Sequence, residues 1–296
     1  MATSNFYQDF LFGSISASIS KTIIAPLERV KLLLQLQDAS TQISAEKKYR
    51  GIIDCFVRVN REQGVASFWR GNWANVVRYF PTTAFTFATK DWFKRTFLSL
   101  DANAPKWKAV LANMLAGGFA GAAATIVSYP LDYARTRLAA DIGKAANDRL
   151  YQGMMDCMQK TYKTDGMVGL YRGVMISVPG FMVYRASYFG LYDSIKELLK
   201  EKNITLGFFP KFVIAQLITS FSGTLYYPFD TVRRRMMMQS GRSDVLYSGT
   251  LDCIRKIHAE EGVVAFFKGG FTNVLRSTGG ALVLILYDVF KDSISK

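Results

Sequence analysis

Long apolar segments alternate with polar ones along the chain. Residues 110–131 contain no charged side chain, and residues 212–229 contain none either. Both lengths are close to the ~20 apolar residues that an α-helix needs to cross a bilayer. Three further apolar segments run from a glycine to the neighbourhood of an aspartate: Gly71 to Asp91, Gly173 to Asp193 and Gly269 to Asp288. The pattern therefore predicts several helices that each span a membrane.

The polar stretches between these segments contain short amphipathic sequences. Residues 52–62 are an example, and their pattern favours a helix that lies on the membrane surface. A soluble helical solenoid is the alternative for a repetitive helical chain. It does not account for the long uncharged segments.

Four sequence markers recur three times in the same order, which indicates a tandem triplication. The first is a proline followed by an acid two residues later and a base five residues later. It occurs at Pro26, Pro130 and Pro228. The other markers are Tyr-x-Gly (Tyr49, Tyr151, Tyr247), a cysteine (Cys55, Cys157, Cys253) and aromatic-basic-Gly (Trp69, Tyr171, Phe267). We therefore predict an all-α membrane protein of six transmembrane helices in three repeats with pseudo-threefold symmetry. The repeats cover residues 1–104, 105–206 and 207–296 and together form one transport domain.

Acid–base pairs recur at both ends of the predicted spans. An acid and a base three residues apart share one face of a helix. Single pairs of this kind are usually surface pairs of little energetic value. Their threefold recurrence instead favours two gates, in which acids and bases pair between neighbouring helices. The first set is Glu28/Lys31, Asp132/Arg135 and Asp230/Arg233, and the second is Asp91/Lys94, Asp193/Lys196 and Asp288/Lys291, with Tyr192 and Tyr287 before the last two acids.

Composition narrows the class of protein. The chain has 296 residues, 37 Lys and Arg against 23 Asp and Glu, and a formal charge of +14, yet half of its residues are hydrophobic. A chain both apolar and basic suggests a membrane protein that handles anions. Nucleic-acid binding would require the basic groups on a solvated face, whereas many of them recur at helix ends and within the predicted spans. We therefore expect no nucleic-acid partner. Three cysteines argue against a disulfide scaffold, and the first twelve residues lack the positive charge of a cleavable targeting signal.

Sequence motifs for nucleotide chemistry and for metals are absent. The chain has no Gly-x-x-x-x-Gly-Lys-Ser/Thr loop, so a P-loop ATPase is not supported. His258 is the single histidine, and the three cysteines occupy equivalent repeat positions, which favours packing over a metal site. We expect no enzyme activity, no cofactor and no metal.

A few cations fall inside the apolar segments, where a charge is a functional hypothesis by default. Arg78 and Arg276 occupy equivalent positions in repeats 1 and 3, and no acid lies within their own segments. Lys21 and Arg185 also interrupt apolar stretches. Arginine binds phosphate bidentately, so these residues predict a polyanionic ligand. Tyr184 could stack on a planar ring.

The proline-acid-base signature, with its aromatic-basic-Gly partner, resembles the mitochondrial carrier family over essentially the whole chain. The resemblance implies a monomeric transporter of the mitochondrial inner membrane that works by alternating access, with three short amphipathic helices on the matrix side. The first set of pairs would be its matrix gate, with Gln35 as a brace, and the second its cytoplasmic gate. Repeat 1 departs from the family pattern at Gln63, where repeats 2 and 3 have Asp165 and Glu261.

The string Arg-Arg-Arg-Met-Met-Met at residues 233–238 resembles the members of this family that exchange ADP and ATP. The resemblance implies electrogenic exchange of cytosolic ADP for matrix ATP. It also implies that phosphates bind Lys21, Arg78 and Arg276, with help from Arg234 and Arg235. The adenine would contact Gly180, Phe181 and Tyr184. Another carrier for adenylates or phosphate, or a proton-leak uncoupler, remains an alternative.

Anionic lipid is a further expected partner. Each Tyr-x-Gly and aromatic-basic-Gly marker begins a predicted helix, whose free backbone N–H groups attract phosphate. The resemblance implies that this lipid is cardiolipin. The expected contact positions are Gly51, Gly71, Gly153, Gly173, Gly249 and Gly269.

Overall fold

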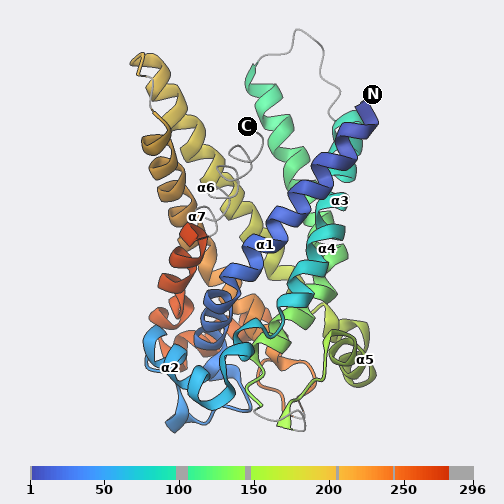
Figure 1. The fold of residues 1–296 in the computed structure, drawn as a ribbon, viewed down its shortest axis with the longest axis vertical. Helices are drawn as coiled ribbons and strands as arrows, with labels where there is room; N and C mark the ends of the chain where they lie inside the picture. The colour runs from blue at the N-terminus through green and yellow to red at the C-terminus, as the bar shows by residue number, and fades with distance from the viewer. Residues whose placement is uncertain (1, 98–105, 144–147, 205–206, 243, 280–296) are drawn as a thin grey trace.

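The computed structural model describes residues 2–97, 106–143, 148–204, 207–242 and 244–279. Within these ranges the chain is helical and contains no strand. The long helices are α1 (Ala2–Leu36), α3 (Asn72–Phe97), α4 (Lys106–Ala140), α6 (Val174–Glu201) and α7 (Phe208–Gln239). A further helical segment covers residues 270–279. The long helices run along the longest axis of the molecule and spread apart toward its upper end (Figure 1).

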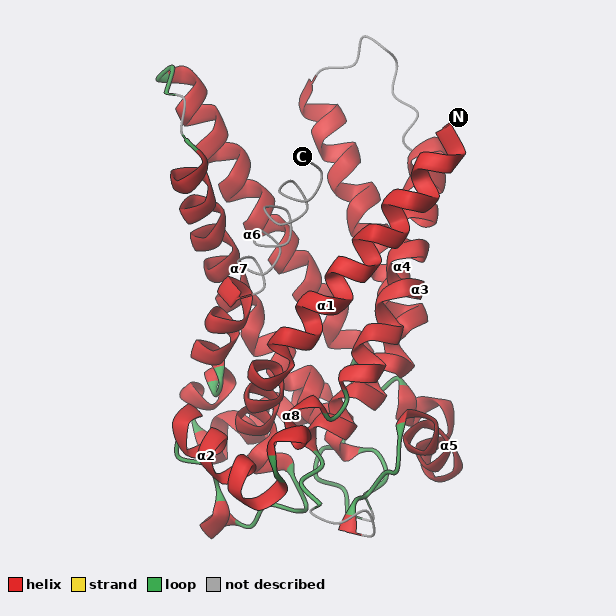
Figure 2. Cartoon of the chain, in the orientation of Figure 1, coloured by secondary structure: helices red, strands yellow, loops and turns green. Residues whose placement is uncertain are grey.

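Shorter helices gather at the opposite end of the molecule (Figure 2). They are α2 (Ile52–Gln63), α5 (Met154–Leu170) and α8 (Thr250–Lys256), with α8 continued by a π-helical turn at Ile257–Glu261. α5 contains a break at Gly166, where φ is 64°. Short 3₁₀ helices occur at Gln37–Ala39, Ala45–Lys47, Val65–Trp69 and Val263–Phe267.

The three short helices each bury one face against the helix that precedes them. Their cysteines, Cys55, Cys157 and Cys253, lie in separate apolar clusters and are fully buried. Burial raises the pKa of each thiol to about 12. The packing role expected for these residues agrees with this placement.

The lower ends of α1, α4 and α7 converge. Leu36 ends α1 and Ala39 follows it, Ala139 and Ala140 end α4, and Met238 lies near the end of α7; together they form part of one buried apolar cluster. Higher in the molecule, α3 packs along α4 and α6 along α7. α4 and α6 approach closely at Gly121, because a Cβ there would lie 2.5 Å from the ring of Phe181.

Judged by length and apolarity alone, no single helix within the described part of the chain qualifies to cross a membrane. α5 and α6 pass the same criterion when taken together, with a bend of 51° between them.

Candidate functional site

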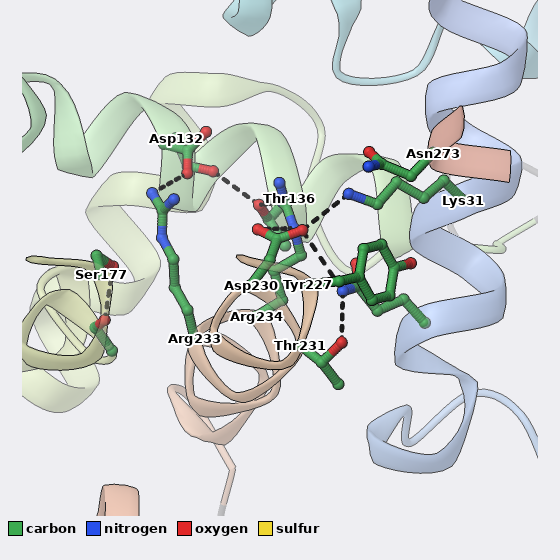
Figure 3. A network of polar contacts seen from close by, with 12 residues as sticks. Lys31, Asp132, Thr136, Ser177, Tyr227, Asp230, Thr231, Arg233, Arg234 and Asn273 are labelled. Atoms are coloured by element: carbon green, nitrogen blue, oxygen red, sulfur yellow. Dashed lines mark hydrogen bonds and ion pairs between the residues drawn. The ribbon is translucent and has the colours of Figure 1, made fainter. Parts of the chain in front are cut away.

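Acids and bases of the repeated signature pair between helices just above the apolar cluster. Each acid pairs with a base from a different long helix, so that the contacts form a closed ring. Figure 3 shows two of these pairs, Asp132 with Arg233 and Asp230 with Lys31. The pairs are Glu28 with Arg135, Asp132 with Arg233, and Asp230 with Lys31, the last at 2.8 Å. The ring joins α1, α4 and α7, as expected from the three repeats.

Gln35 lies beneath one pair of the ring. Its Nε2 donates to Thr231 Oγ1 at 2.8 Å and lies 3.5 Å from Asp230 Oδ2. The side chain is fully buried, and its Oε1 has no hydrogen-bond partner in the described part of the chain. The equivalent positions in the other repeats are Ala139 and Met237, so this contact occurs once in the ring.

Every acid of the ring also contacts a second cation. Arg276 Nη1 lies 3.5 Å from Glu28 Oε1, and Arg78 Nε lies 3.7 Å from Asp132 Oδ1. Arg234 Nε donates to Asp230 Oδ1 at 2.9 Å. The sequence did not predict these partners, because Glu28 and Asp132 lie outside the apolar segments that contain Arg276 and Arg78. Arg78 and Arg276 are therefore paired, and their partners are the acids of the ring.

A cavity of about 430 Å³ opens directly above the ring. Its walls come from all five long helices and from residues 270–279. Among the predicted substrate residues, those that line it are Arg78, Phe181, Tyr184, Arg234 and Arg276. The three acids of the ring form part of its floor, so the candidate ligand site and the ring share side chains.

Two asparagines position the paired arginines, and sequence reasoning missed both. Asn75 Oδ1 accepts from Arg78 at 3.4 Å, and Asn273 Oδ1 accepts from Arg276 at 3.2 Å. Asn75 also donates to Glu28 at 3.1 Å. The sequence does contain a pattern that indicates these asparagines. Asn-x-x-Arg occurs at equivalent places in repeats 1 and 3, and repeat 2 has Ser177 and Gly180 there.

One wall of the cavity is aromatic. The ring of Phe181 packs over Gly121, and the guanidinium of Arg185 lies 4.9 Å from that ring. Tyr184 stacks on Tyr188 with ring centroids 6.1 Å apart. This wall offers flat apolar surface beside the cationic floor.

Gly180 is not part of this wall. A Cβ at this position would lie 2.6 Å from the Cβ of Phe229, so the glycine allows α6 to pack against α7. In this structure Gly180 has a packing role between helices, and its contact with a ligand stays a prediction.

Arg235 and Lys21 also lie away from the cavity lining. Successive residues of a helix point about 100° apart, so the three consecutive arginines of α7 face different directions. Arg235 is fully buried and pairs with Glu261 and Asp38. It is not among the residues that line the cavity in this structure, and its assistance in substrate binding stays a prediction. Lys21 Nζ lies 5.5 Å from the ring centroid of Tyr79.

The second set of acid–base pairs is only partly covered by the structure. Asp91 and Lys94 lie on α3, and Tyr192, Asp193 and Lys196 lie on α6. Tyr192 stacks on Tyr188 at 6.2 Å. Tyr287, Asp288 and Lys291 lie outside the described residues.

The six predicted lipid glycines fall into two groups. Gly51, Gly153 and Gly249 precede α2, α5 and α8 with extended backbone, and a Cβ on any of them would meet open space. Gly71, Gly173 and Gly269 have φ between 79° and 84°. A Cβ on them would lie within 3.1 Å of the backbone oxygens of Arg135, Arg233 and Lys31, respectively. The second group thus lets each following helix approach a base of the ring.

No group of three or more histidine, cysteine or carboxylate side chains suited to a metal occurs among the residues whose positions the structure gives.

One family model and several known proteins match this chain over nearly its full length. The sequence model of the family described as mitochondrial carrier protein matches residues 2–100, 106–203 and 205–296. ADP/ATP translocase 4 of Bos taurus is 57% identical over 289 residues, which cover 97% of this chain and 89% of the relative. ADP/ATP translocase 2 of Bos taurus is 56% identical over 98% of both chains. ADP/ATP translocase 3 of Homo sapiens is 55% identical over 97% of both.

Proposed function

This chain belongs to the mitochondrial carrier protein family, and we propose that it exchanges cytosolic ADP for matrix ATP across the mitochondrial inner membrane. The relatives named ADP/ATP translocase cover nearly its full length at 55–57% identity. Exchange involves no chemical conversion of the nucleotide, so the protein is a transporter rather than an enzyme.

The architecture that supports this function is a monomer with six membrane spans in three repeats. The spans are α1, α3, α4, α6, α7 and the helix that begins at residue 270. The repeats are residues 1–104, 105–206 and 207–296. In this arrangement α2, α5 and α8 lie on the matrix side, and the ring of ion pairs is the matrix gate.

The observation that carries the proposal is the sharing of side chains between cavity and gate. Arg78 and Arg276 line the cavity and also contact Asp132 and Glu28 of the ring. A nucleotide polyphosphate is a strong acceptor for arginine, which binds phosphate with two parallel hydrogen bonds. Phosphates that enter the cavity therefore compete with the gate acids for these two arginines.

This competition gives a route from substrate binding to gate opening. Each gate acid holds at least two cations in the closed ring, and the substrate takes one of them from Glu28 and one from Asp132. Removing a partner from a buried ion pair is strongly unfavourable, so binding weakens the closed ring. A ligand shifts such an equilibrium only by its differential affinity for the two states, and the polyphosphate supplies that difference.

Opening of the matrix ring requires closure at the opposite end. We assign this to the second set of charges, with Asp91, Lys94, Asp193, Lys196, Asp288 and Lys291 as the pairs and Tyr192 and Tyr287 beside them. Because ATP carries one more negative charge than ADP, each exchange moves net charge across the membrane.

The aromatic wall supplies a place for the base. Phe181 and Tyr184 present ring surface next to the cationic floor, and a planar adenine can pack on such rings. Lys21 lies on the same helix as Glu28 and could reach a phosphate after the substrate rearranges the cavity.

The extended glycines at the starts of α2, α5 and α8 support a role for cardiolipin. Gly51, Gly153 and Gly249 leave open space next to the first backbone N–H groups of each helix. A lipid phosphate can approach those groups and the positive end of the helix dipole.

The proposal is tested with purified protein in cardiolipin-containing liposomes. Vesicles loaded with ATP are supplied with labelled ADP, AMP or phosphate, with and without an imposed membrane potential. We expect rapid uptake of ADP, little uptake of AMP or phosphate, and a rate that responds to the potential. Preferred uptake of phosphate would indicate a phosphate carrier, and proton leak without nucleotide uptake would indicate an uncoupler.

A further inference from the structure

A second cavity lies at the end of the molecule that holds the short helices. It has a volume of about 510 Å³ and shares no lining residue with the central cavity. Its walls come from all three repeats: the turn at residues 39–42, the end of α4, α5, and the end of α7 with the loop that follows. Its charged lining residues are Arg137, Asp141, Lys160, Lys163, Arg242 and Asp244.

Arg137 is a buried cation with only uncharged partners. It is 7% exposed, and its guanidinium bonds Tyr151 Oη at 2.5 and 3.1 Å and the backbone oxygen of Met238 at 3.1 Å. No carboxylate forms an ion pair with it in the part of the chain that the structure describes. A buried charge without a counter-charge is unfavourable, which is why such groups are normally paired.

The equivalent residue of repeat 3 has the partners that Arg137 lacks. Arg235 pairs with Glu261 and with Asp38. The counterpart of Glu261 in repeat 2 is Asp165, but its carboxylate pairs with Arg172 at 3.1 Å and accepts from the backbone N–H of Gly241. In repeat 3 Glu261 pairs with both Arg235 and Lys268, the counterpart of Arg172. In repeat 2 the described contacts of Asp165 include no ion pair with Arg137, so the charge of Arg137 is left to the cavity.

Both acids that line this cavity already have partners. Asp141 accepts hydrogen bonds from the backbone N–H groups of residues 143, 150 and 151 and from the side chain of Gln42. Asp244 pairs with Arg242 at 2.7 Å. Lys160 pairs with Asp156, outside the lining, at 2.9 Å. Lys163 is exposed and makes no ion pair with any described residue.

We propose that this cavity binds the phosphate group of an anionic ligand, with Arg137 and Lys163 as its charge partners. Lining cations outnumber lining acids four to two, and both acids already have donors. The volume lies within the range of small-molecule sites. The phosphate has two possible sources with the same chemistry, a soluble nucleotide or inorganic phosphate, or a lipid headgroup. This site is separate from the exchange cavity of the proposed function.

The test uses the full-length protein and measures hydrogen exchange by mass spectrometry. Inorganic phosphate and ADP are titrated in detergent, and cardiolipin is titrated in nanodiscs of neutral lipid. The readouts are protection of residues 150–164, beside this cavity, and of residues 178–188, beside the central cavity. Lys163→Gln is the test variant. Arg61→Gln is its control, because Arg61 is an exposed cation at the equivalent position of repeat 1.

We expect Lys163→Gln to raise the half-saturating ligand concentration for residues 150–164 about tenfold, because one charge-assisted contact is lost. Residues 178–188 should keep their midpoint, and Arg61→Gln should change neither. Protection by phosphate or ADP identifies a soluble ligand. Cardiolipin bound at Gly153 would also protect the start of α5, so protection by cardiolipin alone identifies a lipid headgroup in this cavity where Lys163→Gln shifts its midpoint. Lack of protection by all three, or a midpoint that Lys163→Gln does not move, overturns the proposal.

Discussion

Arg276, in the helical segment at residues 270–279, contacts Glu28 in α1. Its Nη1 lies 3.5 Å from Oε1 of Glu28, whose other oxygen accepts from Arg135. One carboxylate therefore holds a cation that lines the central cavity and a cation of the ring of ion pairs. A ligand that attracts Arg276 would act on the ring without any intermediate residue.

Asn273 is expected to position Arg276 for phosphate. Asn273→Ala removes the hydrogen bond of 3.2 Å that the guanidinium of Arg276 donates to Asn273 Oδ1. A contact of this strength contributes about 1 kcal/mol, so the half-saturating ADP concentration should rise about fivefold with little change in maximal rate. Ser177→Ala is the matched control, because Ser177 holds the same position in repeat 2, three residues before Gly180. Equal effects of both changes would argue against positioning.

Asp230 should dominate the stability of the closed ring. Asp230→Asn leaves Lys31 and Arg234 buried without their shared carboxylate. Breaking a buried pair in this way costs about 3–5 kcal/mol, so thermal unfolding in detergent should occur at a clearly lower temperature. Asp244→Asn serves as the control, since Asp244 is exposed and its pairing with Arg242 is open to water. An unchanged unfolding temperature for Asp230→Asn would contradict the ring as a stabilising element.

The two groups of glycines should respond differently to alanine. Gly173 has φ +84°, and a Cβ there would lie 2.7 Å from the backbone oxygen of Arg233, so Gly173→Ala should destabilise the protein by about 1–3 kcal/mol. The backbone at Gly153 is extended, and the Cβ added in Gly153→Ala would meet open space, so stability in detergent should stay nearly unchanged. It should instead lower cardiolipin binding, measured by native mass spectrometry. Similar losses of stability in both variants would remove this distinction.

The three cysteines should resist alkylation in the folded protein. Burial raises the pKa of Cys55, Cys157 and Cys253 to about 12, so the reactive thiolate is scarce at neutral pH. Maleimide labelling followed by mass spectrometry should be slow at pH 7 and become fast only on unfolding. Rapid labelling of any one of them in the native state would show that its helix opens.

The sequence predicted the ring because its acids and bases recur in register. A separation of three residues placed Glu28 and Lys31 on one helix face, and three equivalent helices around an axis left pairing between neighbours as the natural arrangement. The second cation at each acid was not predictable in this way. Arg78 and Asp132 lie on different helices of different repeats, and their approach depends on how α3 packs along α4.

Arg234 and Arg235 mark a second limit of sequence reasoning. They are adjacent in one motif, yet the turn of the helix directs one to the cavity floor and the other to Glu261. Arg137 and Arg235 are equivalent in register, but Arg235 pairs with Glu261, whereas Arg137 bonds the Tyr151 hydroxyl and the backbone oxygen of Met238. Register predicts which residues correspond between repeats. The identity of each partner depends on packing between helices.

Nucleotide binding at Arg78 and Arg276 is proposed to drive obligatory exchange. The initial rate of labelled ADP uptake into cardiolipin-containing liposomes, either loaded with ATP or empty, should therefore be measured for the unaltered protein and for Arg78→Ala. We expect uptake only into loaded vesicles, and a loss of about a hundredfold or more in Arg78→Ala, because a phosphate ligand and a gate contact disappear together. Uptake into empty vesicles, or an unchanged rate in Arg78→Ala, would show that these arginines do not couple binding to exchange.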